Sequence, residues 1–239
     1  MKLKFLGRGS AFNIKEGNTS AYYKEGTDML LIDCGSTVFS KIIEKNVLDG
    51  VHDLYIAITH SHPDHIGSLG DLIFYCYYVV RIRVHILYCN RVRDDIIKYF
   101  EVCGIENYMY NFLNKGFSFG NDLMHILFGL CAHVDNLYSY NLFILYKNEK
   151  IFYSGDCCRL AHTYDRDLVI QFNTETISES NVIYIECSYY DKSNIVHFGL
   201  NELNFIFSHL KDKVYCMHFD CDECIEKCKE YGFNVVEVE

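Results

Sequence analysis

A cluster of three histidines and one aspartate is the feature that most constrains what this chain can fold into. The sequence Thr59–Gly67, THSHPDHIG, directly follows an apolar run that predicts a buried strand. A loop at the end of a strand directs its side chains into a cleft, so His60 and His62 can converge on one ion. Asp64 and His65 can then turn toward a second ion. Imidazole and carboxylate ligands suit zinc and its neighbours in the transition series, so we expect a metal centre here rather than a polar surface turn.

Short apolar strands alternate with helical patterns along the whole chain. Strands are predicted at Leu3–Leu6, Ser20–Tyr23, Met29–Ile32, Leu54–Thr59, Val84–Tyr88, His125–Leu130, Leu142–Leu145, Ile151–Tyr153, Val182–Ile185 and Val214–Met217. Helices are predicted at Val38–Lys45, Ile66–Tyr75, Arg93–Val102, Leu200–Leu210 and Glu223–Tyr231. No linker is visible, so we expect one layered α/β (α+β) domain over residues 1–239, with sheets packed together and helices outside.

Composition and charge exclude several classes of protein. Half of the 239 residues are hydrophobic and 15% are aromatic, which excludes disorder. A net charge of -10 argues against extended nucleic-acid binding and against attraction to an anionic membrane. The N-terminal sequence does not resemble a signal peptide, and the longest apolar run, Leu72–Val80, is far shorter than the roughly 20 residues that span a bilayer. We therefore expect a cytoplasmic protein whose twelve cysteines are mostly reduced and buried.

The histidine cluster resembles the His-x-His-x-Asp-His signature of the metallo-β-lactamase superfamily. Four further segments are similar to the other motifs of that superfamily and occur in the same order: Met29–Gly35, Cys131–His133, Ser154–Asp156 and Cys216–His218. Together the five motifs cover nearly the whole chain. The resemblance implies an αββα four-layer sandwich with a two-metal site along the edge of the sheets.

The same resemblance implies how the ligands divide between two metals. One metal would be held by His60, His62 and His133, the other by Asp64, His65 and His218, and Asp156 would bridge them. Two Zn²⁺ ions are the implied cofactors, and Mn²⁺ or another divalent transition metal is the other option. A shared carboxylate is physically reasonable, because cations roughly 3.5–4 Å apart repel each other.

Within the superfamily, the chain resembles the ribonuclease Z branch. The similarity lies in Phe5–Phe12, in Asn18–Ser20, and in Ile185–Tyr189 followed by His197. In that branch a histidine donates a proton and a glutamate orients it, which implies phosphodiester hydrolysis. The implied catalytic residues are Asp64, which would orient the nucleophile, Glu186 and His197.

The expected substrate is a nucleotide rather than a tRNA. Ile185 and Cys187 depart from the branch's usual residues, and a chain with one proline has no Gly-, Pro- and Lys-rich arm for gripping tRNA. In length, opening motif and compactness the chain resembles the phage anti-Pycsar proteins. That resemblance implies hydrolysis of 3′,5′-cyclic nucleotides, such as cyclic CMP and cyclic UMP, to nucleoside monophosphates. It also implies a homodimer and a role in phage counter-defence in the cytoplasm of the host cell.

Three other functions are open at this point. The chain could be a tRNA 3′ endonuclease of the ribonuclease Z type, a hydrolase of lactones or thioesters, or a protein that sequesters nucleotides without turnover. The retained Glu186 and His197 argue against the second function. The complete set of ligands argues against the third.

Aromatic residues and arginines indicate possible contact surfaces. The 20 tyrosines and 17 phenylalanines favour an interface, and Tyr99–Phe119 is the candidate lid or dimer contact. Tyr108 and Tyr110 could stack on a base, although core or dimer packing is favoured. Four arginines could clamp a phosphate, but we favour ion pairing with Asp94, Asp95 or another subunit: Arg81, Arg83, Arg91 and Arg93. Arg81 and Arg83 are expected on one strand face.

Three cysteines near the C-terminus have a spacing that zinc ligands can show. Cys221, Cys224 and Cys228 follow shortly after His218. A structural zinc site needs a fourth ligand and commonly a second cysteine pair, which this segment lacks. We therefore expect Cys224 and Cys228 to be core thiols on one helix face, and we expect about two metals per chain.

Overall fold

The computed structural model describes residues 1–89, 93–113, 116–158, 174–190 and 196–239, and two mixed sheets form its centre. The strands of the first sheet, in spatial order, are β1 (Lys4–Gly7), β2 (Ser20–Glu25), β3 (Asp28–Ile32), β4 (Asp53–Ala57), β5 (Arg83–Leu87) and β6 (Asn111–Leu113). The strands of the second sheet are β13 (Asn234–Val235), β12 (Val214–Met217), β11 (Val182–Glu186), β10 (Glu149–Tyr153), β9 (Ser139–Tyr146), β8 (Asp122–Cys131) and β7 (Gly116–Phe119). Strands β3 to β6 pair in parallel, as do β10 to β13.

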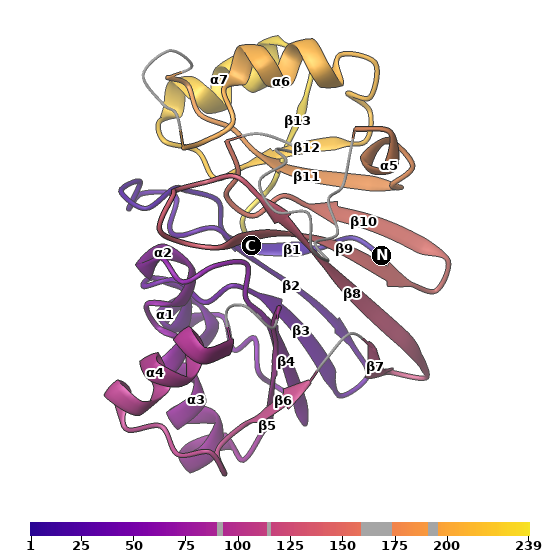
Figure 1. Cartoon of the computed structure of the whole chain (residues 1–239). Coiled ribbons are helices and arrows are strands. Elements are labelled where there is room, and N and C mark those ends of the chain that lie inside the picture. The colour runs from indigo at the N-terminus through magenta and orange to yellow at the C-terminus, as the bar shows by residue number, and fades with distance from the viewer. Residues whose placement is uncertain (90–92, 114–115, 159–173, 191–195) are drawn as a thin grey trace.

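Helices cover the outer face of each sheet. In chain order the helices are α1 (Val38–Glu44), α2 (Pro63–Ile66), α3 (Leu69–Tyr75), the π-helix η1 (Cys76–Val80), α4 (Arg93–Cys103), α5 (Thr174–Ser178), α6 (Leu200–Phe207) and α7 (Asp222–Glu230). Helices α1 to α4 lie against the first sheet, and α5 to α7 lie against the second (Figure 1). None of the helices in the described part of the chain is long and apolar enough to span a membrane.

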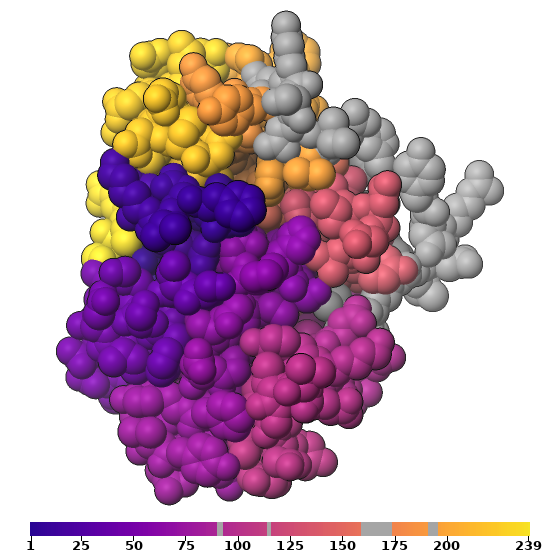
Figure 2. All heavy atoms as spheres, turned by 90° about the vertical axis from the view of Figure 1, so that its left-hand side faces the viewer, coloured from indigo at the N-terminus to yellow at the C-terminus, as the bar shows by residue number. Residues whose placement is uncertain are grey.

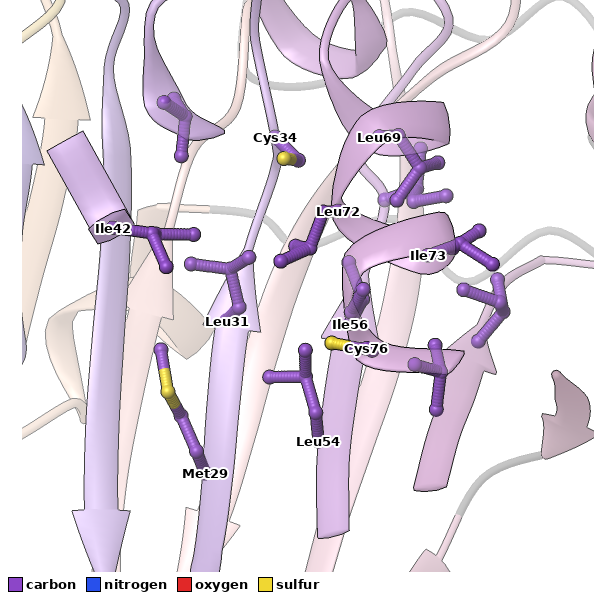
Figure 3. Packing of buried hydrophobic residues seen from close by; sticks show 14 of the residues in the cluster. Met29, Leu31, Cys34, Ile42, Leu54, Ile56, Leu69, Leu72, Ile73 and Cys76 are labelled. Carbon is purple, nitrogen blue, oxygen red and sulfur yellow. The ribbon is translucent and has the colours of Figure 1, made fainter. Parts of the chain in front are cut away.

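Three hydrophobic cores separate four layers. The first core packs Leu31, Leu54 and Ile56 against side chains of α1 and α3, as Figure 3 shows. The second core fills the space between the two sheets, and the third lies between the second sheet and helices α6 and α7. These cores confirm the expected αββα sandwich.

Strand β4 illustrates why this sequence forms a central strand. Leu54 and Ile56 belong to the core under the helices, whereas Tyr55 and Ala57 belong to the core between the sheets. A strand covered on both faces needs apolar residues at successive positions rather than in alternation. The sequence Leu54–Ile58 meets that requirement, and it delivers Thr59 and His60 to the carboxyl edge of the sheet.

Each predicted strand and helix occurs, but one predicted helix is divided. The expected helix Ile66–Tyr75 is two helices, because α2 ends at Ile66 and α3 begins at Leu69. A Cβ atom on Gly67 would overlap the carbonyl oxygen of Pro63 and the hydroxyl of Ser36, so the chain passes close to its neighbours at this break. Elements that the sequence did not predict are η1, β6, β7, α5 and β13.

The arginine expectations are partly wrong. Arg81 does not share a strand face with Arg83, because it has a left-handed φ of 59° and ends η1 before β5 begins. Arg83 forms an ion pair, as expected, but its partner is Asp53, directly opposite on β4. Arg93 lies over the ring of Phe112, 5.2 Å from its centre. Arg91 lies outside the described residues.

The N-terminal loop holds the two halves of the molecule together on one face. The amide of Ser10 donates to the carbonyl of Phe219, and the amide of Phe219 donates to the carbonyl of Arg8. Figure 2 shows this N-terminal segment in indigo between the C-terminal part in yellow and the purple first half. The loop therefore fixes the backbone next to His218.

Candidate metal centre

The carboxyl ends of strands from both sheets meet at one edge and carry the functional side chains. In the first sheet, Asp33 follows β3 and the segment His60–His65 follows β4. In the second sheet, polar side chains occur at or just beyond the ends of four strands: His133 after β8, Asp156 after β10, Glu186 at the end of β11 and His218 after β12. Parallel strands end on the same edge, and a ligand site at such an edge is a general property of sheets of this kind.

One group of donor atoms comes from His60, His62, His133 and Asp156. The ligand atoms of all four residues lie within 4.8 Å of one another. Nδ1 of His62 lies 3.1 Å from Nε2 of His60 and 3.2 Å from Nε2 of His133. Oδ2 of Asp156 lies 3.8 Å from Nε2 of both His60 and His133. Three imidazoles and one carboxylate oxygen therefore face a common point.

A second group comes from Asp64, His65, His218 and again Asp156. The ligand atoms of these residues also lie within 4.8 Å of one another. Oδ1 of Asp156 lies 3.2 Å from Nε2 of His65 and 3.3 Å from Nε2 of His218. Each of those nitrogens lies 3.4 Å from Oδ2 of Asp64. Asp156 thus directs one carboxylate oxygen toward each group.

The donor set fits divalent metal ions. Nε2 of His65 and Oδ1 of Asp156 are buried, and neither has a well-directed hydrogen-bond partner among the described residues. A buried polar atom without a partner costs about 1–3 kcal/mol, so such atoms require an explanation. A cation between them would satisfy both, and nitrogen with carboxylate oxygen is a donor set that zinc and related transition metals accept.

Neighbouring groups fix the imidazole rings so that one nitrogen of each faces the centre. Nδ1 of His65 lies 2.8 Å from Oδ2 of Asp33, and Nδ1 of His133 lies 2.7 Å from the carbonyl oxygen of Val196. Nδ1 of His218 lies 3.4 Å from Oε2 of Glu186. Such contacts to the second ring nitrogen are typical of metal-binding histidines, because they set the tautomer and the ring orientation.

Asp33 is a site residue that the sequence reasoning missed. It lies in the expected Met29–Gly35 motif, but no role was assigned to its side chain. The structure buries it completely, and its oxygens accept hydrogen bonds from the amide and the hydroxyl of Thr59, both at 2.8 Å. Its position directly after a buried strand, like that of His60, is the signal that could have identified it.

The backbone takes a left-handed conformation at three positions of the site. Asp33 and His218 both have a φ of 60°, and Gly155, before Asp156, has a φ of 55°. Aspartate and histidine adopt this region more readily than most residues, but it is still uncommon outside glycine. The three positions lie just beyond β3, β10 and β12, and sparsely populated backbone conformations of this kind cluster at functional sites.

The two groups of ligands differ in charge. Burial lowers the pKa of His60 well below its usual range, and burial also lowers the pKa of His62, so these two imidazoles are neutral and able to bind a cation. Burial would likewise lower the pKa of His218, but Asp156 and other nearby carboxylates outweigh it and raise that pKa to about 10. At neutral pH His218 therefore carries a proton that a bound metal must displace.

Glu186 and His197 meet beside the two groups of ligands. Nδ1 of His197 lies 2.7 Å from Oε2 of Glu186 and 3.8 Å from Oδ2 of Asp156. The other oxygen of Glu186 accepts a hydrogen bond from the amide of Cys157. Burial would lower the pKa of His197, but the charge of Glu186 and its hydrogen bond raise it. The arrangement leaves a half-buried histidine that holds a proton next to the metal ligands.

The structure brings all nine side chains predicted for the site to this one edge. They are His60, His62, Asp64, His65, His133, Asp156, Glu186, His197 and His218. Tyr108 and Tyr110 pack against other rings, in line with the core or dimer packing favoured for them. Tyr110 contacts Phe100 with ring centres 4.6 Å apart, and Tyr108 contacts Tyr77 at 5.5 Å.

Comparison with known proteins places the chain among proteins of related sequence and fold. The family model described as Anti-Pycsar protein Apyc1 matches residues 1–236. Proteins of that description from Paenibacillus harenae and Bacillus phage BSP38 are 24% and 26% identical, over 92% and 91% of this chain and 90% and 88% of theirs. The metallo-β-lactamase fold protein YhfI from Bacillus subtilis superposes with a TM-score of 0.69 at 18% identity, and the match covers 99% of this chain and 95% of that chain.

Proposed function

Because the chain belongs to the Anti-Pycsar protein Apyc1 family, we propose that it hydrolyses 3′,5′-cyclic nucleotides to nucleoside monophosphates. Cyclic CMP and cyclic UMP are the proposed substrates, and two divalent metals, Zn²⁺ first, are the proposed cofactors. In a phage, such an activity would remove a cyclic-nucleotide signal from the host cytoplasm. The observation that carries the proposal is the Glu186–His197 pair, 2.7 Å apart, beside two adjoining groups of metal ligands.

The ligand groups support a binuclear centre. His60, His62 and His133 would hold one metal, and Asp64, His65 and His218 would hold the other. When bound, the two cations would neutralise charge on the phosphate and lower the pKa of water. Asp156 would bridge them, since its two oxygens face different groups.

The residues of this chain supply the orientation and the proton. In the proposed reaction the oxygen of a water molecule forms a bond to phosphorus, and the bond from phosphorus to a ribose oxygen breaks. Glu186 holds Nδ1 of His197, so Nε2 is the nitrogen that gives a proton to the departing ribose oxygen. Asp64, whose Oδ2 lies 3.4 Å from Nε2 of both His65 and His218, would orient the water and accept its proton as the new bond to phosphorus forms.

A panel of substrates tests the proposal against the other functions. The metal-loaded protein is incubated with cyclic CMP, cyclic UMP, a precursor tRNA and a lactone, each with and without a chelator. We expect nucleoside monophosphate from the cyclic nucleotides and loss of that product with chelator. Cleavage of the tRNA alone would indicate a ribonuclease Z-type endonuclease. Binding of cyclic nucleotide without product would indicate a sequestering protein.

A further inference from the structure

Four buried cysteines meet in the layer between the second sheet and α7. They come from three places in the fold: Cys187 directly after β11, Cys216 in β12, and Cys224 and Cys228 on α7. None of the four side chains has measurable exposure. The spacing in the sequence groups Cys221 with Cys224 and Cys228. In the structure Cys221 is half-exposed at the start of α7, and Cys187 and Cys216 lie in the cluster instead.

The sulfur atoms are close enough to share one ion. Sγ of Cys187 lies 3.3 Å from Sγ of Cys228 and 3.6 Å from Sγ of Cys224. The sulfurs of Cys187, Cys216 and Cys228 all lie within 4.8 Å of one another. In a tetrahedral zinc site each sulfur lies about 2.3 Å from the ion, which puts neighbouring sulfurs about 3.8 Å apart. The two separations from Cys187 fall close to that value, and Cys224 adjoins the group of three sulfurs through its contact with Cys187.

The fold brings these sulfurs together through ordinary register and helix geometry. Cys216 pairs with Ile185 on β11, and the amide of Cys187 donates to the carbonyl of Met217, so the two strands present Cys187 and Cys216 side by side. Cys224 and Cys228 are four residues apart on a helix and therefore share one face. That face packs on the strands within the third hydrophobic core.

As thiols, the cysteines have poor hydrogen-bond partners. Sγ of Cys224 lies 3.6 Å from the carbonyl oxygen of Cys187, and Sγ of Cys187 lies 3.9 Å from that of Met217. Soft thiolate ligands in a closed, apolar site are the usual environment of structural zinc, which needs no open coordination position. We propose that Cys187, Cys216, Cys224 and Cys228 form a structural zinc site, separate from the two metals of the proposed function.

This site would support the edge on which the metal centre lies. Cys187 follows Glu186 in the chain, and Cys216 precedes His218 by two residues. Zinc bound to the cysteines would tie α7 to the ends of β11 and β12, just behind the side chains of Glu186 and His218. Binding would release a proton from each thiol that becomes a ligand.

Cobalt substitution tests the site directly on the full chain. The protein is prepared under reducing conditions, stripped of metal and reloaded with Co²⁺. A cobalt–thiolate bond gives intense near-ultraviolet charge-transfer absorption, whereas the nitrogen and oxygen ligands of the metal centre do not. We expect that absorption in the unmodified protein and in His133→Ala, which removes a ligand of the other centre. Cobalt-loaded protein without the absorption would overturn the proposal, whether or not any cysteine variant folds.

Elemental analysis with a matched pair of variants provides the second measurement. We expect about three zinc ions per chain in the unmodified protein and in Cys221→Ser, whose side chain is nearby but outside the cluster. We expect one fewer in Cys228→Ser. Equal zinc content in Cys228→Ser and Cys221→Ser would contradict the proposal.

Discussion

His197 is positioned to give a proton to the leaving group, and its removal provides the sharpest prediction for a single residue. An alkoxide leaving group needs that proton, and general acid catalysis contributes roughly 10²–10⁴-fold. We expect His197→Ala to lose about that factor in kcat on a cyclic nucleotide while it keeps its metals. With bis-p-nitrophenyl phosphate the loss should be much smaller, because nitrophenolate leaves without a proton. Equal losses on the two substrates would show that His197 is not the donor.

Glu186 controls the pH range over which His197 can act. Burial lowers the pKa of His197, and the charge of Glu186 raises it above its ordinary value. The protonated form is the active one, so kcat should fall as pH rises through this raised pKa. In Glu186→Gln the burial effect would dominate, and the alkaline limb of the profile should move to lower pH. Profiles of kcat against pH measure this, and an unchanged alkaline limb would contradict the assignment.

Asp33 orients the predicted metal ligand His65, although it is not itself one of the predicted ligands. Its contact with Nδ1 of His65, at 2.8 Å, orients the nitrogen that faces Asp156. Loss of such a partner commonly reduces metal affinity by about 10–100-fold, and we expect an effect of that size from Asp33→Asn. Asp53→Asn is the matched control, because Asp53 pairs with an exposed arginine on the surface. Chelator competition measures both affinities, and equal affinities in the two variants would refute the role of Asp33.

At the scale of elements, the sequence could predict a site residue where that residue closely follows a recognisable strand. Each of His60, Asp156 and His218 follows closely on an apolar strand, so both the strand and the polar residue are visible in the sequence. The short edge strands β6 and β13 depend on pairing with a neighbour, and no local pattern of two or three residues identifies them. The cysteine cluster was missed for a similar reason, because β11, β12 and α7 meet only in the folded chain.

The turn after β3 is packed tightly against the histidine segment. A Cβ atom on Gly35 would overlap the backbone carbonyl of Asp64. Overpacking of this kind costs about 1–3 kcal/mol, and we expect Gly35→Ala to lower stability by that amount and to weaken metal binding. Gly70→Ala is the control, because a Cβ there meets its neighbours at ordinary contact distances of 3.5 Å or more. Thermal unfolding of the two variants tests this, and equal midpoints would contradict it.

At the scale of the whole molecule, the four layers leave an aromatic surface exposed. Tyr78 and Tyr108 are 54% and 61% exposed, and both contact Tyr77. The contacts lie in and beside the segment Tyr99–Phe119, which the sequence indicated as a dimer contact. Aromatic residues are favoured at interfaces, so we expect light scattering to give twice the 28.0 kDa mass of one chain. A 28.0 kDa species throughout the micromolar range would contradict a homodimer.

The most direct measurement follows the phosphorus of the substrate itself. Cyclic CMP and cyclic UMP are incubated with the metal-loaded protein, and ³¹P NMR distinguishes the cyclic phosphate from the monophosphate product. The account predicts conversion to the monophosphate, its arrest by chelator, its return with added Zn²⁺ or Mn²⁺, and almost none in Asp156→Ala, which removes the residue shared by both ligand groups. Intact cyclic phosphate in the presence of fully loaded protein, or conversion that continues unchanged in Asp156→Ala, would contradict it.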